Sequence, residues 1–278
     1  MNRLFVAYKP PFIGSNGFLS RLKRKYGVKS AGFSGILDPF AKGALIVAFG
    51  QYARLFNYLA KTPKVYRATL WLGARSESLD IERISRIDPT PRLTPRAIDE
   101  TLSAFVGESE QYPPIFSAIK INGERSYRLA RKGENVKMKA RKINVYSLKP
   151  IAYAHPFLTF EAAASEGCYM RSLGRDIALS LGCAGALSSL ERLKEGRFCF
   201  ENEKPLNPLD FIDLQRNQYW GDGADLYCGK RLSVGSLAIQ ENGDYLIESE
   251  GFFVIINLFG GAVSYKLGRV AVSRSQTC

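Results

Sequence analysis

At 278 residues the chain is long enough to bury a full hydrophobic core, and its 46% hydrophobic and 12% aromatic residues exclude an intrinsically disordered protein. The formal net charge of +13 lies entirely in residues 1–215, which hold 33 basic and 20 acidic residues, whereas residues 216–278 hold six of each. We therefore expect a basic body that binds a polyanion, followed by a neutral C-terminal part.

The polyanion is expected to be nucleic acid. The sequence holds no apolar run of about 18 residues and no lipidation motif, so an anionic membrane is a poorer match to this charge. The apolar stretch at 4–8 meets Lys9 and Pro10 too early to be a signal peptide, which predicts a cytoplasmic protein. No protein partner is indicated, and we expect a monomer.

Cysteine and histidine usage narrows the chemistry. The cysteines form no C-x-x-C pair, which predicts reduced thiols rather than disulfides or a zinc site. The cysteines are Cys168, Cys183, Cys199, Cys228 and Cys278. His155 is the only histidine, which disfavours imidazole-rich metal sites and Ser-His-Asp catalysis. We expect no metal and no cofactor, and catalysis by carboxylate, tyrosine, arginine or lysine side chains.

Hydrophobic spacing predicts strands and helices in turn along the N-terminal part. A strand at 4–8 precedes an amphipathic helix at 17–26, whose basic face is either solvated or in contact with RNA. A glycine-rich loop then leads into an apolar strand at 44–50, followed by an expected helix at 51–61. The alternating run at 64–73 is typical of a half-buried strand.

The middle of the chain continues this mixture. Thr94 and Pro95 are suited to begin a helix that runs to about residue 106. Strands are expected at 140–146 and 157–162, and a further helix ends near residue 181.

The loop between residues 32 and 43 presents a carboxylate. Its glycines permit positive φ and close backbone approach, and Pro39 biases Asp38 toward an extended conformation. An isolated Asp-Pro pair is more often a turn or a helix cap than a catalytic group. The surrounding string decides between these interpretations.

That string resembles the first motif of the bacterial tRNA pseudouridine-55 synthases, the TruB family, which reads G-H-T-G-x-L-D-P-x-A-x-G. The matching residues are Gly32, Gly35, Leu37, Asp38, Pro39, Ala41 and Gly43. Phe33 and Ser34 stand where the family has histidine and threonine. The resemblance implies that Asp38 is the catalytic aspartate and that Phe33 contacts substrate by shape, without the hydrogen bonds of a histidine.

Three further motifs match in order. Lys64-x-Tyr66-Arg67 resembles the second motif, which implies that Tyr66 stacks on the target base. Gly167-x-Tyr169-Met170-Arg171 resembles the third, which implies that Tyr169 lines the base pocket and that Arg171 pairs with Asp38 and lowers its pKa. Leu190 is the apolar floor in the closing motif, where Glu191 replaces the first family arginine.

The segment before Asp80 matches the family only in part. Family members carry a threonine-rich loop that ends in Ser-Asp, whereas Leu79 precedes Asp80 here. We expect a surface turn at this position, and the alternative is that Asp80 helps to orient the site.

A basic insertion spans about 108–142. Between Lys120 and Lys142 nine Lys/Arg face only two acidic residues, which is typical of salt-sensitive phosphate binding. The pattern Lys120-x-Asn122-Gly123 and the residues after it resemble the RNA-binding insertion of the family. A solvated helical face is the alternative for its arginines. The residues expected to bind tRNA are Lys120, Arg125, Arg128, Arg131 and Lys132.

In the C-terminal part, glycines separate short β-rich runs at 245–248, 252–257 and 262–272. Such spacing predicts a small β-barrel, and the pattern resembles a shortened PUA-type RNA-binding domain. We therefore expect a catalytic domain at 1–215 and a small β-rich domain at 216–278.

The resemblance implies an α+β pseudouridine-synthase fold, with a mixed, largely antiparallel central sheet flanked by helices. It implies a cofactor-free isomerase that converts uridine to pseudouridine at position 55 in the T loop of tRNA, using an aspartate on a flipped-out base. Two alternatives remain open at this stage. One is a synthase that acts on another RNA, and the other is a non-catalytic tRNA-binding or tRNA-folding protein.

Overall fold

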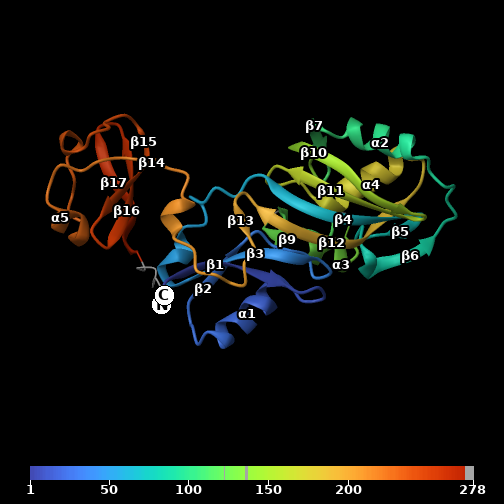
Figure 1. Ribbon diagram of the computed structural model, residues 1–278, viewed down its shortest axis with the longest axis horizontal. Helices are drawn as coiled ribbons and strands as arrows, with labels where there is room; N and C mark the ends of the chain where they lie inside the picture. Colours follow the sequence, from blue (N-terminus) through green and yellow to red (C-terminus); the bar gives the residue numbers. More distant parts are fainter. Residues whose placement is uncertain (122, 135–136, 273–278) are drawn as a thin grey trace.

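The computed structural model describes residues 1–121, 123–134 and 137–272, so Asn122 of the insertion motif and Cys278 lie outside the described residues. Within these ranges no helix is both long and apolar enough to cross a membrane. Figure 1 shows an elongated molecule with a large sheet in its body and a small sheet (orange to red) at one end.

The body is built on a nine-stranded sheet with the main strand order β1-β3-β12-β4-β11-β10-β7, to which β2 adds beside β3 and β13 beside β12. Only β12 and β3 pair in parallel, and the other pairs are antiparallel. The strands are β1 (Arg3–Lys9), β2 (Ala31–Ser34), β3 (Lys42–Phe49), β4 (Lys64–Leu72), β7 (Gly107–Gln111), β10 (Arg141–Ala154), β11 (Phe157–Ala164), β12 (Gly185–Glu195) and β13 (Phe198–Cys199). The expected α+β fold with a mixed, largely antiparallel sheet is confirmed.

Helices pack on this sheet because doing so buries their apolar faces away from water. The longer ones are α1 (Ser15–Lys25), α2 (Pro95–Ala104) and α4 (Met170–Ser180). Leu173 and Ile177 of α4 are buried in a core shared with Leu70 and Phe160 of the sheet. The Thr94 side chain caps α2, with Pro95 at the first position as predicted.

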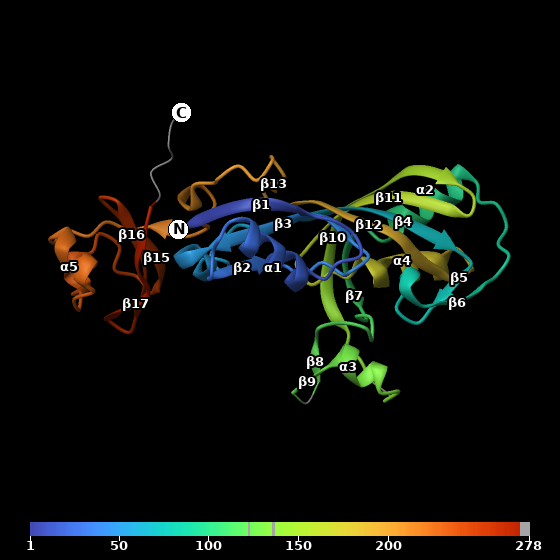
Figure 2. The same cartoon turned by 90° about the horizontal axis from the view of Figure 1, so that it is seen from below.

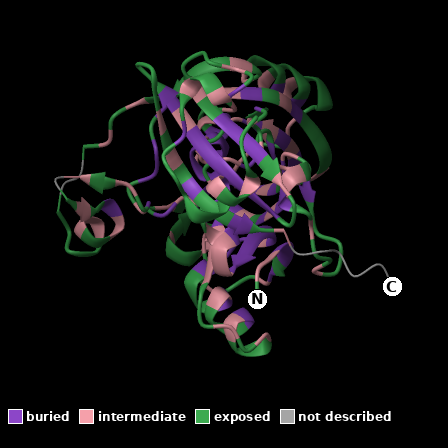
Figure 3. Ribbon diagram, turned by 90° about the vertical axis from the view of Figure 1, so that its left-hand side faces the viewer, coloured by how far each residue is buried: buried purple, intermediate pink, exposed green. Residues whose placement is uncertain are grey.

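Two chain segments form small structures outside the large sheet. Between β7 and β10, the strands β8 (Lys120–Ile121) and β9 (Glu124–Arg125) and the helix α3 (Ser126–Arg131) project away from the body, as Figure 2 shows. The hairpin of β5 (Ala74–Ser76) and β6 (Ile84–Ile87) leads through the 3-10 turn η2 (Ile81–Arg83). Figure 3 shows that buried residues gather along the strands, whereas loops are mostly exposed.

The C-terminal part forms a separate four-stranded sheet. Its strands are β14 (Gln215–Arg216), β15 (Gly243–Ser249), β16 (Phe252–Phe259) and β17 (Ala262–Ala271), and they pair in this order beside the short helix α5 (Gly223–Cys228). One face buries Val254 and Ile256 in a core of its own, whereas Phe253 and Ile255 share a core with Leu4 of the body. The three predicted C-terminal strands are confirmed, and closure into a barrel stays a prediction.

The expected helix at 51–61 is wrong. Only a 3-10 segment, η1 (Gly50–Arg54), forms there, and turns follow it. The backbone N–H of Ala60 bonds the Phe211 carbonyl, and the Tyr58 carbonyl accepts from the N–H of Asp213, so these groups bond a distant segment rather than the next helical turn. The apolar spacing of Leu55 and Leu59 was misleading because both side chains are buried through this irregular path.

Candidate active site

Asp38 lies in the loop that joins β2 to β3, and glycines determine how closely this loop meets the sheet. Gly43 has φ of +111°, and a Cβ there would lie 2.2 Å from the backbone oxygen of Arg192. Arg192 and Gly43 are partners in the parallel β12–β3 pair of the large sheet, so only glycine admits this approach. The Asp38 side chain keeps 32% of its surface exposed, which leaves it accessible to a substrate.

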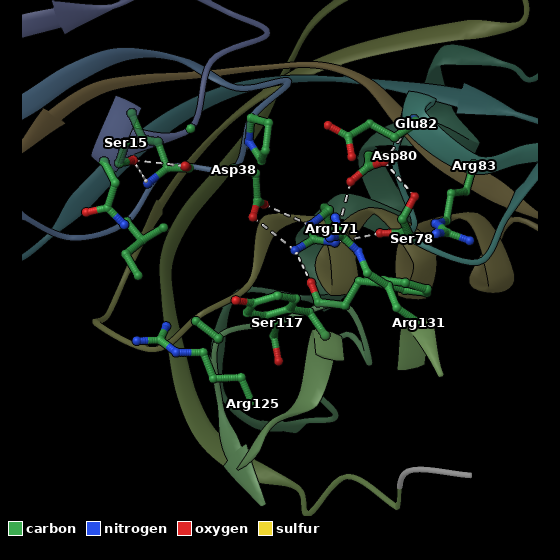
Figure 4. A pocket seen from close by; sticks show the side chains of 18 of the residues that line it. Ser15, Asp38, Ser78, Asp80, Glu82, Arg83, Ser117, Arg125, Arg131 and Arg171 are labelled. Carbon is green, nitrogen blue, oxygen red and sulfur yellow. Dashed lines mark hydrogen bonds and ion pairs between the residues drawn. The ribbon is translucent and has the colours of Figure 1, made fainter. Parts of the chain in front are cut away.

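Arg171, in the first turn of α4, holds the Asp38 carboxylate with two hydrogen bonds. Its Nε donates to Oδ2 at 2.8 Å and its Nη2 to Oδ1 at 3.1 Å, as Figure 4 shows. The Arg171 side chain is only 4% exposed. This two-point contact is typical of a guanidinium that fixes the orientation of a carboxylate.

Further partners from separate loops hold Arg171 itself. Its Nη1 donates to the Ser78 carbonyl at 2.7 Å, and its Nη2 donates to the Phe116 carbonyl at 2.8 Å. Asp80 lies 3.4 Å from Nη1 and is itself 3% exposed. The expectation of a surface turn at Asp80 is therefore wrong, because its carboxylate is turned inward and bonds Ser78 Oγ at 2.6 Å.

The environment of Asp38 shifts its pKa in a direction that the sequence did not predict. Burial raises the pKa of Asp38 above its ordinary value, and the charge of Asp80 adds to this rise. Arg171 opposes it, as expected of a paired guanidinium, but burial is the larger effect. The predicted effect of Arg171, which is to lower the pKa of Asp38, has the right sign, but burial outweighs it and the pKa rises.

One cavity beside Asp38 brings the predicted base-pocket residues together. It measures about 260 Å³, and Tyr66 from β4, Tyr169 from the start of α4 and Leu190 from β12 all line it with Asp38. Tyr66 is 9% and Leu190 5% exposed, so these two walls are largely removed from water, whereas Lys64, Arg171 and Arg192 add charged groups to the lining. The cavity can enclose a planar ring against an aromatic face with a carboxylate at its edge.

A second cavity of about 310 Å³ also contains Asp38 in its lining and extends toward the insertion. Phe33 lines this second cavity rather than the one with Tyr66. Arg125 and Arg131 from the insertion line it as well, and Figure 4 shows both side chains below Asp38. Residues 116–118, which also belong to the insertion, line this cavity too.

The remaining basic residues of the insertion lie outside both cavities. Lys120 lines a separate hollow with Lys139 and Arg141. Arg128 is exposed beside the Tyr127 ring, with 6.0 Å between its guanidinium and the ring centre. Lys132 pairs with Glu124 at 2.9 Å. These side chains are placed for contact with an extended partner rather than with a group inside the site.

Several site residues were missed by sequence reasoning. Gln111, at the end of β7 and 3% exposed, accepts from the Tyr169 N–H at 2.8 Å and donates to the Tyr169 carbonyl at 3.2 Å. Lys9 is fully buried, and burial lowers its pKa to about 8 against the opposing effect of Asp38. The sequence analysis predicts no strand at 107–111 and so gives no signal for Gln111, whereas the strand expected at 4–8 ends just before Lys9 but does not predict the contact of Lys9 with the site.

The fold is shared with chains from solved multi-component complexes. The structure superposes on a chain from a "Cbf5-Nop10-Gar1 Complex" with a TM-score of 0.64 and 19% identity, covering 98% of this chain and 84% of that one. A chain from an "H/ACA RNP bound to a substrate RNA" gives a TM-score of 0.63 at 18% identity. At this identity the likeness shows the fold alone.

Sequence comparison gives the family. The model described as "TruB family pseudouridylate synthase (N terminal domain)" matches residues 23–170. The chain is 52% identical over 270 residues to the tRNA pseudouridine synthase B of Sulfurovum sp., covering 97% of this chain and 98% of that protein. It is 50% identical to the enzyme of the same name from Sulfurimonas denitrificans, with 97% and 99% covered. The chain belongs to the TruB family of pseudouridylate synthases and is an isomerase, which confirms the resemblance.

Proposed function

We propose that this enzyme isomerises the uridine at position 55 in the T loop of tRNA, with Asp38 as the nucleophile. The observation that carries the proposal is the Asp38–Arg171 pair at the junction of the two cavities, with Tyr66 in the wall of one of them. The names of the relatives, tRNA pseudouridine synthase B, support tRNA as the substrate because their identity extends over 97% of the chain.

The reaction requires few kinds of group. The N1–C1′ bond of uridine breaks, the uracil turns, and a C5–C1′ bond forms, while the proton at C5 is lost and N1 gains one. The atomic composition of the nucleotide is unchanged, so the reaction needs no oxidant or reductant. A carboxylate nucleophile, held ionised by a guanidinium, is suited to this bond exchange. Asp38 fulfils that role, and Arg171 keeps its oxygens in a fixed orientation.

The cavity with Tyr66 retains the detached base. Tyr66 stacks on the uracil, and Tyr169 and Leu190 close the space around it. Because these residues are mostly buried, water is excluded while the base is not bonded to the ribose. The target nucleotide leaves its stack to enter, as other enzymes that act on a base require.

Binding of the RNA relies on the basic insertion. Arg125 and Arg131 contact phosphates at the entrance of the second cavity, and Phe33 occupies the space beside the extruded nucleotide by shape. Lys120, Arg128 and Lys132 contact the backbone farther out. Such contacts add affinity without sequence information.

The chain has two functional parts in this proposal. Residues 1–215 are the catalytic domain with the insertion at about 108–142, and residues 216–278 form the PUA-like part, whose neutral charge favours shape recognition over phosphate attraction. The enzyme acts as a cytoplasmic monomer.

The deciding experiment maps pseudouridine at single-nucleotide resolution in an unmodified tRNA transcript. Wild type yields product at the T-loop uridine, whereas Asp38→Asn keeps tRNA affinity but loses at least about 10³-fold in rate because the amide is not a nucleophile. Asp176→Asn, an exchange of the same kind on α4, serves as the matched control. An active Asp38→Asn variant would refute the mechanism. Product in another RNA alone would show that the enzyme acts on that RNA rather than on tRNA. Binding without product from wild type would favour a tRNA-folding role.

A further inference from the structure

Buried side chains from three different elements hydrogen-bond alternate residues of the Asp38 loop, which joins β2 to β3. Arg192 on β12 donates to the Gly35 carbonyl at 3.0 Å. Ser15 on α1 bonds the backbone of Leu37. Lys9 on β1 donates to the Pro39 carbonyl at 3.3 Å. The residues on both sides of Asp38, Leu37 and Pro39, therefore have backbone atoms bonded by side chains from other elements.

Ser15 holds the residue immediately before Asp38. Its Oγ donates to the Leu37 carbonyl and accepts from the Leu37 N–H, both at 3.0 Å. Ser15 is 4% and Leu37 3% exposed, so water is a poor substitute for either bond. One hydroxyl thus fixes the donor and the acceptor of Leu37, and the orientation of the next residue follows from them.

Arg192 spans the loop from one end to the other. Its Nη2 bonds the Gly35 carbonyl, and its Nε donates to the Ala44 carbonyl at 2.8 Å. A Cβ at Gly35 would lie 2.9 Å from Arg192 Nη1, so the loop backbone packs directly on the guanidinium.

A buried carboxylate neutralises the charge of Arg192. Glu195, which is fully buried, lies 2.9 Å from Arg192 Nη2 and 3.3 Å from Lys64 Nζ. A buried guanidinium with a paired carboxylate keeps one geometry, because any movement separates charges that water does not reach.

We propose that Ser15 and Arg192 are positioning residues for catalysis, which hold the backbone around Asp38 so that its carboxylate meets the reacting carbon of the target nucleotide. The inference rests on the proposed nucleophilic role of Asp38. Both residues act through the loop backbone rather than through the ribose or the base. A displacement of about 1 Å at a reacting group costs about 10²-fold in rate, so the loss of one such bond is measurable.

The first test compares Ser15→Ala with Ser20→Ala. Both serines lie on α1, but Ser20 is exposed and bonds only the Asn16 carbonyl of its own helix. The readouts are the single-turnover rate of pseudouridine formation at saturating enzyme, the tRNA Kd, and the Tm. We expect Ser15→Ala to lose about 30- to 100-fold in rate. Its Kd should stay within about twofold of the Ser20→Ala value, because Ser15 lines the second cavity but its hydroxyl bonds the Leu37 backbone.

A second variant keeps the test decisive if Ser15→Ala does not fold. Arg192→Lys retains a positive charge beside Glu195 but does not donate in the two directions of Gly35 and Ala44. Arg96→Lys, on the exposed face of α2, is the matched control. The expected result is again a loss in single-turnover rate of at least about tenfold with an unchanged Kd.

The outcomes separate this inference from the proposed function. Rates within about threefold of the controls overturn the positioning role. Loss of tRNA binding in step with the rate, or unfolding of both variants, overturns it too, because the contacts then serve the fold alone. Asp38→Asn is measured in the same assay. An active Asp38→Asn variant refutes the nucleophile, whereas an inactive one with fully active Ser15→Ala and Arg192→Lys refutes only the positioning role.

Discussion

The Asp38 loop and the basic insertion use charged and polar residues in opposite ways. Around Asp38 the partners Arg171, Asp80 and Arg192 are nearly fully buried, and each bonds a particular backbone or carboxylate atom. In the insertion Arg125 and Arg128 are exposed, without comparable anchoring. A reacting carboxylate needs one geometry, whereas phosphates are attracted by charge at many geometries. The comparison therefore predicts that changes near Asp38 affect the chemical step and changes in the insertion affect binding.

The largest effect is expected from Arg171→Met. The change removes both bonds to the carboxylate and leaves Asp38 and Asp80 without their shared cation. We expect a loss of about 10³-fold in single-turnover rate, and a fall of about 3 kcal/mol in the free energy of unfolding, because Arg171 is 4% exposed. Urea unfolding and a single-turnover assay check both values. Arg175→Met is the control, because Arg175 lies on the same helix, is 28% exposed and pairs with Asp176 rather than with Asp38. Equal effects of the two variants would contradict the comparison.

A smaller effect, on binding alone, is expected from replacing Arg125, Arg128, Arg131 and Lys132 together by Ala. The tRNA affinity should fall by about 10²-fold, and the slope of log affinity against log salt should flatten by about two to three units. The single-turnover rate at saturating enzyme stays near wild type. Alanines at Lys230, Arg231 and Lys266 remove similar charge from the neutral C-terminal part and should leave the slope nearly unchanged. An unchanged slope in the insertion variant would favour the solvated-face interpretation.

The pH dependence follows from the raised pKa of Asp38. The ionised carboxylate is the reactive form, so the single-turnover rate falls as pH drops through this pKa, by about tenfold per unit below it. Because burial raises the value, the acid limb lies above 3.8, the ordinary value for aspartate.

Glu82 is the matched control for that limb, since burial raises its pKa as well and it lines the same cavity. The Glu82→Gln variant should keep the acid limb. Disappearance of the limb in this variant would assign the titration to Glu82 instead.

The smallest effect concerns Lys132, the one insertion residue of the predicted set with a described ion pair, to Glu124. Glu124→Gln releases Lys132 for phosphate, and we expect the tRNA affinity to rise about twofold. Glu134→Gln makes the same charge change nearby, so an equal gain in both variants would point to net charge rather than to the release of Lys132. Filter binding at several salt concentrations measures the difference.

Local pattern was sufficient for much of the fold. The strands around 4–8, 64–73 and 157–162 and the cap of the helix at Thr94 followed from side-chain alternation and from capping chemistry, which depend on neighbouring residues. The helix expected at 51–61 failed because residues 58–60 bond residues 211–213, and no local pattern encodes such a partner.

For the site, the sequence by itself determined the chemical inventory: a carboxylate at Asp38 on a glycine-rich loop, a guanidinium at Arg171, aromatic rings at Tyr66 and Tyr169, and a basic insertion. Only the tertiary structure decided how they act on one another. It placed Phe33 in a different cavity from Tyr66, buried Asp80 beside Arg171, and raised the pKa of Asp38. The physical reason is that burial and electrostatic coupling depend on distances between segments far apart in the sequence, such as Asp38 and Arg171, which 133 residues separate.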